Sequence, residues 1–246
     1  MSNPTAATII IGNEILSGRT LDINTQEIAL RLSEIGVSLV ETRTIADDRT
    51  MIIDTVRELS SKYDYIFTTG GIGPTHDDIT AEAMAAAFNV SYVRSDEIYN
   101  ILKNYYDKMG EKLNSAREKM AYIPESSKLL HNDATMVPGF VISNVFVMAG
   151  IPNIMKAMLK SAIPMLKRGA VIQSKTLEVM LGESKIAINF EELQNKYKEV
   201  EMGSYPFTRN GNHGTALVLR SSNYYSLDKA FAELEIVING LKNLNT

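Results

Sequence analysis

The chain has 246 residues, of which 45% are hydrophobic and 22% charged, and its net charge is −4 at pH 7. This composition is typical of a folded globular protein with a substantial core, and the negative charge provides no general attraction for nucleic acid or acidic membranes. There is no cysteine and there are three histidines, which excludes disulfides, thiolate zinc sites and cysteine nucleophiles and disfavours a histidine-rich metal site.

The amino-terminal segment lacks a basic region followed by a long apolar core, so we expect no signal peptide. No stretch approaches the roughly 18 uninterrupted apolar residues that a membrane-spanning helix needs. These patterns predict a cytoplasmic protein that binds neither nucleic acid nor membranes.

The first 90 residues alternate between strand and helix patterns. We expect strands over residues 6–11, 37–45 and 65–69, with helices over residues 24–35, 50–61 and from residue 80 onward. The first helix carries Ile28, Leu32 and Ile35 at helical spacing, before Gly36 at its carboxyl end. This alternation is typical of a parallel sheet covered on both faces.

Residues 95–122 differ in character, because they form two amphipathic helix patterns that break near Gly110. We expect the stripe of Tyr99, Leu102 and Tyr106 to pack in the core. Then follow a strand over residues 128–131, a turn-rich segment over 132–140, a strand over 144–149 and a helix from residue 152.

From about residue 169 the pattern becomes strand, helix, strand, strand, helix. The sequence therefore predicts two domains, residues 1–168 and a small α+β unit over residues 169–246. In the second, residues 203–206 predict a turn that could reach over a ligand, and residues 210–215 predict a loop.

The sequence TTGGIGPTHDDIT is the strongest candidate for a site. A buried strand ends at Gly70 and Gly71, Gly73 follows, and a helix begins that Asp78 or Thr80 could cap. A loop between a strand's carboxyl end and a helix's amino end favours an anion, and glycines let the backbone approach a phosphate closely. The predicted phosphate-binding residues are Gly70, Gly71, Gly73, Thr75, Ser17 and Asn24.

Adjacent carboxylates at Asp77 and Asp78 would repel a bare phosphate, so they indicate a bridging divalent cation with a preference for hard oxygen ligands. Glu14 follows the first predicted strand and Asp47 the second. Because parallel strands end at the same edge of a sheet, we expect these four carboxylates to converge. We predict a metal site at Asp47, Asp77 and Asp78, and catalytic roles for Asp78, Asp77 and Glu14.

Simpler interpretations stay open for each of these residues. The glycine segment could be simply a tight turn. Asp22 or Asn24 could be no more than a cap of the first helix, and Asp48 of the second. His76 could donate a proton or contact phosphate, although a loop histidine is more often solvated. The segment GGIGPTHD lacks the GK[ST] ending, so it is not a P-loop.

The segment TTGGIGPTHDDITAEAMAAAF resembles the signature of the molybdopterin-binding (MoCF, MogA-like) fold, which molybdenum-cofactor biosynthesis proteins share with the amino-terminal domain of the competence/damage-inducible CinA family. IIIGNEILSGRTLDINTQEIALRL is similar to the same family's opening, and PGF and GIPNIM continue the resemblance. SKTLEVMLGESKIA and MGSYP are similar to the amino-terminal domain of eukaryotic FAD synthases.

The resemblance implies a three-layer α/β/α sandwich with a mostly parallel sheet, a small carboxy-terminal α/β subdomain, and a homo-oligomer. In adenylyl-transferring relatives the second Asp of the motif is functionally important, and it corresponds to Asp78 here. The preceding position, often Arg in those relatives, is Asp77, which favours cleavage over transfer. We expect neither the amidohydrolase activity of full-length CinA nor the synthase activity of FAD synthases, whose domains have no counterpart in these residues.

The resemblance thus implies a metal-dependent nucleotide pyrophosphatase, with Mg²⁺, Mn²⁺ or Co²⁺, that cleaves ADP-ribose or FAD-like dinucleotides. One alternative is a molybdopterin-binding or adenylyl-transferring protein of molybdenum-cofactor biosynthesis. Another is a non-catalytic binding module. In each case the expected partner is a small nucleotide or pterin phosphate, molybdopterin included.

Overall fold

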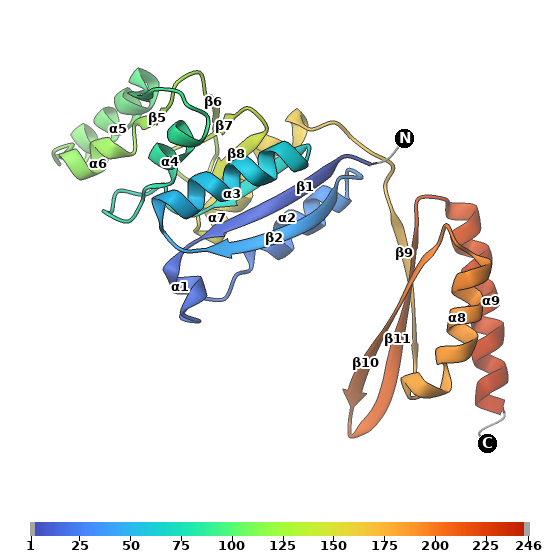
Figure 1. Ribbon diagram of the computed structural model, residues 1–246. Helices are drawn as coiled ribbons and strands as arrows, with labels where there is room; N and C mark the ends of the chain where they lie inside the picture. Colours follow the sequence, from blue (N-terminus) through green and yellow to red (C-terminus); the bar gives the residue numbers. More distant parts are fainter. Residues whose placement is uncertain (1–2, 244–246) are drawn as a thin grey trace. The chain divides into compact units, whose positions relative to one another are not determined.

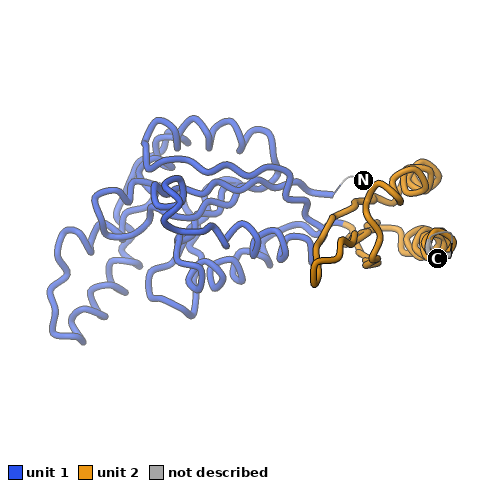
Figure 2. The backbone as a smooth tube through the Cα atoms, turned by 90° about the horizontal axis from the view of Figure 1, so that it is seen from below, with its two compact units in different colours: residues 1–169 blue, residues 170–246 orange. Residues whose placement is uncertain are grey.

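The computed structural model describes residues 3–243. The chain forms two compact units, residues 1–169 (unit 1) and residues 170–246 (unit 2), as Figure 2 shows. This division lies one residue after the boundary expected from the sequence.

Unit 1 is built on a six-stranded sheet with the order β2-β1-β3-β8-β7-β6. Its strands are β1 (Thr5–Ile11), β2 (Ser38–Ile45), β3 (Tyr65–Thr69), β6 (Lys128–Leu130), β7 (Gly139–Ile142) and β8 (Val145–Met148). β1, β2, β3 and β8 run parallel, whereas β7 is antiparallel to both of its neighbours. The predicted mostly parallel sheet is confirmed.

Helices cover both faces of this sheet, which makes the three layers that were expected (Figure 1). α3 (Arg49–Lys62) and α4 (Thr80–Ala87) pack into one core cluster, and α2 (Asn24–Ser33) and α7 (Pro152–Ala162) into the other. β1 serves both clusters, because Ile9 lies in the first and Ala6 in the second. Two short helices complete this part of the unit, α1 (Asn13–Leu16) and the 3₁₀ helix η1 (Ile163–Met165).

Residues 92–124 form an excursion from the main sheet, which we call the α5–α6 excursion. It contains β4 (Tyr92–Arg94), α5 (Asp96–Lys108), α6 (Ser115–Lys119) and β5 (Tyr122–Pro124). The two predicted helices are confirmed, and β4 and β5 add an antiparallel pair that the sequence did not predict. Leu102 is fully buried and Tyr99 and Tyr106 pack partly buried against the same core, as predicted.

Part of the predicted turn-rich segment 132–140 is strand instead. β7 begins at Gly139, pairs with Leu130 and Val147, and is buried along its whole length. A strand of four residues that follows proline and starts with glycine resembles a turn in sequence. The hairpin that follows turns at Ser143, whose φ is 53°.

Unit 2 is a three-stranded antiparallel sheet with the order β10-β11-β9 and its own helices. Its elements are β9 (Gln173–Val179), the 3₁₀ helix η2 (Glu183–Lys185), α8 (Ala187–Lys196), β10 (Glu201–Arg209), β11 (Asn212–Ser221) and α9 (Tyr224–Asn243). Residues of β9, β11 and both α-helices, Val179 and Leu217 among them, form a third core cluster, and Met202 of β10 packs against it.

The turn predicted over residues 203–206 is wrong. These residues lie inside β10, where Gly203 pairs with Val218 and Pro206 with Thr215. The chain instead turns at Asn210 and Gly211, with φ of 52° and 78°, so the predicted loop over residues 210–215 is reduced to these two residues. Positive φ at both central residues is what a tight hairpin turn requires, and Asn-Gly supplies it easily.

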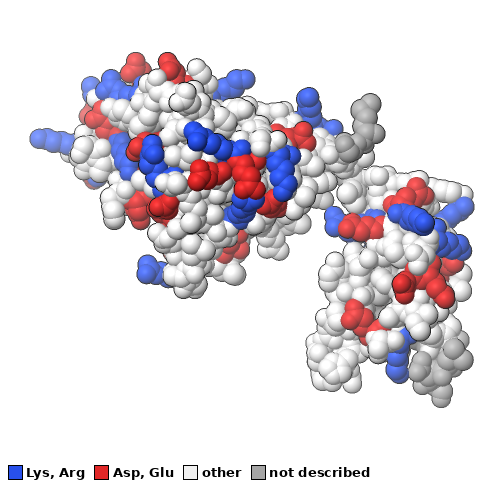
Figure 3. Space-filling view, viewed as in Figure 1, with Lys and Arg blue, Asp and Glu red and all other residues white. Residues whose placement is uncertain are grey.

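An ion-pair network joins β2 to α3 on the outside of unit 1, where Figure 3 shows acidic and basic side chains close together. Glu41 accepts hydrogen bonds from Lys62 Nζ at 2.8 Å, Tyr63 Oη at 2.6 Å and Arg43 Nε at 2.7 Å. These bonds, that of Lys62 first, lower the pKa of Glu41 to about 2. Arg43 extends the network to Glu58.

None of the helices within residues 3–243 combines the length and apolar character that crossing a membrane requires.

Candidate functional site

A cavity of about 500 Å³ lies at the carboxyl edge of the parallel strands. Its walls come from the end of β1 and from the loops that follow β2, β3 and β8. In the strand order, β2 and β3 flank β1 on opposite sides, so the direction of the chain across the sheet reverses here. Such a switch point is where open α/β sheets bind ligands, and the volume is that of a small-molecule site.

The glycine-rich loop, residues 70–78, forms one wall of this cavity. Gly70 and Gly71 have φ of 104° and 68°, a backbone region that side chains rarely adopt. A Cβ at Gly70 would overlap the carbonyl oxygen of Ile11, and one at Gly71 would overlap the hydroxyl of Thr80. The loop is anchored at its base, where Gly70 N donates to Met148 O at 3.1 Å. Both glycines are therefore required by local geometry.

Thr75 organises the two adjacent carboxylates of this loop. Its backbone N–H donates to Asp78 Oδ2 at 2.7 Å, and its hydroxyl contacts Asp77 Oδ1 at 2.6 Å and also Asp78 Oδ2. The hydroxyl contact holds the pKa of Asp77 below its usual value. Both carboxylates line the cavity. The predicted phosphate role of Thr75 thus stands beside an observed role in fixing carboxylates.

The predicted helix cap at Asp78 or Thr80 is wrong. α4 follows Ile79, and no side chain caps its amino end. Asp78 is instead turned back toward Thr75, while the buried Thr80 hydroxyl donates to Gly70 O at 3.0 Å. The backbone N–H groups at the start of α4 consequently have no side-chain cap next to the glycine-rich loop.

Glu14 lies in α1, directly after β1, and Asp47 lies on the loop after β2. Both line the same cavity as Asp77 and Asp78. Asp47 Oδ2 accepts from the backbone N–H of Asn13 at 2.9 Å, which joins this loop to α1. The structure therefore brings the four predicted carboxylates to one cavity.

Two other aspartates serve as caps. Asp48 accepts from Met51 N at 2.8 Å at the start of α3, and Asp22 accepts from Asn24 N at 2.9 Å and Thr25 N at 3.2 Å at the start of α2. Their capping interpretation is the correct one.

Within residues 3–243, no three acidic or histidine side chains are grouped as ligands of one metal ion. The four carboxylates of the cavity are nevertheless the hard oxygen donors that Mg²⁺ and Mn²⁺ prefer. Mg²⁺ is commonly held by one or two carboxylates, with substrate phosphates and water completing its shell. The donor set fits such a cation better than one enclosed by protein alone.

The remaining predicted residues lie behind the cavity or outside it. Asn24 is 6% exposed and donates from Nδ2 to Gly150 O at 2.8 Å, while its Oδ1 finds no hydrogen-bond partner among the described residues. Ser17 donates to Glu14 O at 3.2 Å and does not line the cavity. The His76 side chain is 98% exposed and lies 4.0 Å from Asp77, the solvated position expected of a loop histidine.

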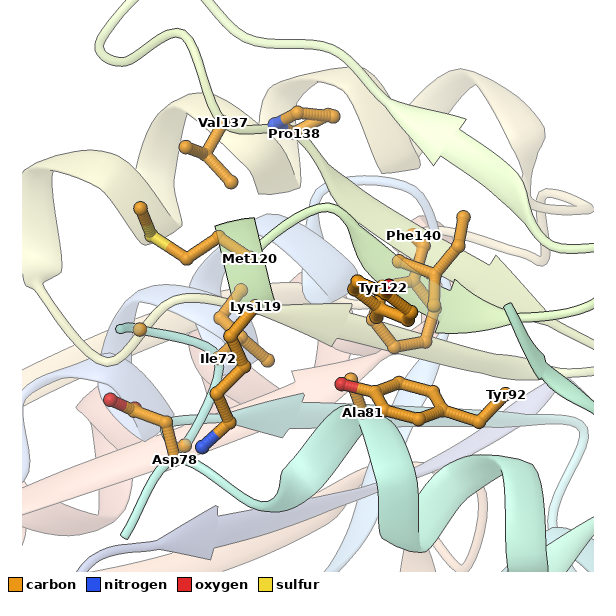
Figure 4. Close-up of a pocket in the computed structure, with 13 residues that line it drawn as sticks. Ile72, Asp78, Ala81, Tyr92, Lys119, Met120, Tyr122, Val137, Pro138 and Phe140 are labelled. Carbon is orange, nitrogen blue, oxygen red and sulfur yellow. The ribbon is translucent and has the colours of Figure 1, made fainter. Parts of the chain in front are cut away.

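Sequence reasoning missed Lys119 and a pair of tyrosines, which line a narrower cavity beside the first (Figure 4). Lys119 Nζ donates to Thr75 O at 2.8 Å across 44 positions of sequence, a contact with no local signal. The rings of Tyr92 and Tyr122 lie 5.6 Å apart, and burial raises the pKa of Tyr92 to about 12. These residues come from the two ends of the α5–α6 excursion.

Apolar side chains also line the main cavity, among them Ile72, Val137, Ile154 and Met158. The described residues that line this cavity include neither Lys nor Arg. The fold and this cavity define a small-molecule-binding α/β domain.

Comparison with known proteins agrees with that class. Residues 7–168 match the family described as "Probable molybdopterin binding domain", and residues 171–241 match "FAD synthase, middle domain". The chain belongs to the molybdopterin-binding domain family, and its second unit is of the kind found in the middle of FAD synthases.

Relatives cover most of the chain. A protein of Archaeoglobus fulgidus is 35% identical over 198 residues, 80% of this chain and 84% of that one. A CinA-like protein of Desulforapulum autotrophicum is 30% identical over 207 residues, 78% of this chain and 49% of that one, so this chain spans about half its length. The solved structure of CinA from Thermoplasma acidophilum, described as of unknown function, superposes with a TM-score of 0.61 at 30% identity and covers 67% of this chain and 99% of that one.

Proposed function

We propose that the chain is a metal-dependent nucleotide pyrophosphatase that cleaves ADP-ribose or an FAD-like dinucleotide. The observation that carries this proposal is the single cavity lined by the glycine-rich loop and by four carboxylates, Glu14, Asp47, Asp77 and Asp78. Its volume of about 500 Å³ suits a ligand of nucleotide size.

The glycine-rich loop and the amino end of α4 bind the diphosphate. Their backbone N–H groups and the dipole of this eight-residue helix favour negative charge. Thr75 keeps Asp77 and Asp78 oriented at the same place. The apolar wall at Ile72 and Val137 then accepts a planar base and excludes water from it.

Asp77, Asp78 and Asp47 would hold the divalent cation, which when bound activates water and withdraws charge from phosphate oxygens. Glu14, from α1, orients the attacking water or binds the ribose. Asp77 supports hydrolysis over transfer, because a carboxylate stands where adenylyl-transferring relatives often carry Arg. A carboxylate-rich rim suits a cation that neutralises a diphosphate.

A hydrolysis assay tests this proposal. We expect purified protein to release AMP from ADP-ribose or FAD with Mg²⁺, Mn²⁺ or Co²⁺, and to lose activity in EDTA. Asp78→Asn should lower kcat by about 100-fold or more, since it removes a charge that acts at the reacting phosphate. Asp54→Asn, on the exposed side of α3, is the control and should stay active. No AMP release with any metal, or full activity of Asp78→Asn, contradicts the proposal.

A second candidate is binding of a pterin phosphate, with or without adenylyl transfer. It is favoured by the description of the family that residues 7–168 match. Incubation with molybdopterin and ATP discriminates the two. Transfer of AMP to molybdopterin without hydrolysis of ADP-ribose supports this candidate, and tight binding without either reaction supports a binding module.

A further inference from the structure

Lys119 is the last residue of α6 and lies where the α5–α6 excursion meets the glycine-rich loop. Figure 4 shows its ammonium group directed toward Asp78. Its Nζ donates to the carbonyl oxygen of Thr75 at 2.8 Å. An ammonium group has three donors, so a single carbonyl leaves two available for a ligand.

The charges around the glycine-rich loop are arranged asymmetrically. The main cavity is lined by Glu14 and Asp47, and no basic residue is among its described lining. The narrower cavity contains Lys119, the one basic side chain among the described residues that line either space. Both cavities share Gly71, Gly73 and Asp78, so Lys119 lies on one side of the loop and the carboxylates of Glu14 and Asp47 line the other.

We propose that Lys119 is a phosphate-binding residue that fixes the direction in which a diphosphate lies across the glycine-rich loop. One phosphate lies beside Lys119, and the next lies toward Glu14 and Asp47. Two adjacent phosphates can use both sides of the loop, whereas a monophosphate can use only one. The site therefore selects diphosphates over monophosphates and nucleosides. The choice of a nucleoside diphosphate rests on the proposed function, but the role of Lys119 requires only binding.

The contact of Lys119 with Thr75 makes a purely structural role the competing explanation. A structural role predicts that loss of the ammonium weakens every ligand equally, because the loop itself would shift. A phosphate-binding role predicts a loss that depends on the number of phosphates. Arginine also binds phosphate and should therefore restore a phosphate-binding role.

The test is calorimetric titration of the full chain with ADP, AMP and adenosine, in Mg²⁺ and in EDTA. We expect Lys119→Met to weaken ADP binding by about 10- to 100-fold, the range for a hydrogen bond to a charged group. In Lys119→Met the affinity for adenosine should be unchanged, and the affinity for AMP should fall less than the affinity for ADP. Lys119→Arg should recover most of the ADP affinity. Lys103→Met, on the exposed side of α5 in the same excursion, is the matched control and should bind like the wild type.

The outcomes separate this inference from the proposed function. Equal ADP affinity in Lys119→Met and wild type, a parallel loss for ADP and adenosine, or no binding of ADP by the wild type would each overturn it. A wild-type protein that binds ADP through Lys119 but releases no AMP from ADP-ribose refutes the pyrophosphatase and supports the inference.

Discussion

Two separate constraints require glycine at position 71, its backbone conformation and the lack of space for a Cβ. Its φ of 68° disfavours any side chain, and a Cβ would also overlap the buried Thr80 hydroxyl, which donates to Gly70. Strain and overlap therefore act at the same position of the glycine-rich loop.

We expect Gly71→Ala to lower the free energy of unfolding by about 1–3 kcal/mol, as is typical of a strained backbone position, and to weaken ADP binding. Gly18→Ala is a matched control, because its φ is 72° but nothing lies within 4 Å of a new Cβ. It should lose only the backbone contribution, about 1 kcal/mol, and keep ADP binding. Urea unfolding of both variants measures the difference, and equal losses would show that the Thr80 overlap is unimportant.

For single residues, the sequence predicts those roles that depend on the adjacent residues in the chain. Gly70, Gly71 and Asp78 stand out because turn chemistry and adjacent charges are local properties. Lys119 does not, since its contact with Thr75 spans 44 positions and a lone lysine on an amphipathic helix suggests only a solvated face. The failed cap prediction has the same origin, as the fold gives the Thr80 hydroxyl a different partner, the carbonyl of Gly70.

The junction of β2 and α3 depends on ion pairs as well as on apolar packing. Glu41 collects three donors there, and its pKa is lowered from 4.5 to about 2. A group whose folded pKa is lowered stabilises the fold above its unfolded pKa, and that contribution disappears as pH falls through the folded value.

We therefore expect wild-type stability to fall as pH decreases from about 4.5 to about 2, in part through Glu41. Glu41→Gln should be less stable than the wild type near neutral pH, with a gap that narrows steadily over this window. Urea unfolding at a series of pH values measures the gap. Glu125→Gln, an exposed position elsewhere in unit 1, should follow the wild-type slope. A gap independent of pH would show that the network does not couple to folding.

Elements with strong periodicity were predicted well, and short or paired ones were not. α2 and α3 carry regular apolar stripes, whereas β4, β5 and β7 have only three or four residues each and are defined by pairing with another strand. In unit 2 the residues at positions 203–206 have turn composition, but β11 pairs with them along their whole length. Pairing therefore overrides local preference there.

The two units have separate cores. Every buried member of the third core cluster lies between Val179 and Ile238, and none belongs to the clusters of unit 1. Two hydrogen bonds hold the carboxyl end of unit 1 against the rest of that unit. Gly169 N donates to Ile35 O and Lys167 N donates to Tyr65 Oη, both at 2.9 Å.

We expect a chain that ends at residue 169 to fold on its own. Its thermal midpoint should lie within about 4 °C of the unit 1 transition in the full chain, because the hydrogen bonds of Lys167 and Gly169 are retained. Two thirds of this chain already match almost the whole of the solved CinA protein. Calorimetry and ADP titration of residues 1–169 measure both properties, and the absence of a cooperative transition would mean that unit 2 is needed for folding.

For the whole molecule, the sequence predicted the class of sheet but not its strand order. Alternating strands and helices imply parallel neighbours, yet nothing local states that β3 lies between β1 and β8 or that β7 reverses direction. The convergence of Glu14, Asp47 and Asp78 followed from that class alone, because the carboxyl ends of parallel strands share an edge.

The hydrogen bond from Gly70 N to Met148 O and that from Asn24 Nδ2 to Gly150 O each join residues that leave the ribosome at very different times. A ribosome that has released the first hundred residues has released the glycine-rich loop but not the strand that anchors it. The loop gains its anchor only when β8 enters the sheet, after residue 150 has left the exit tunnel. The cavity at the glycine-rich loop is therefore a late product of translation.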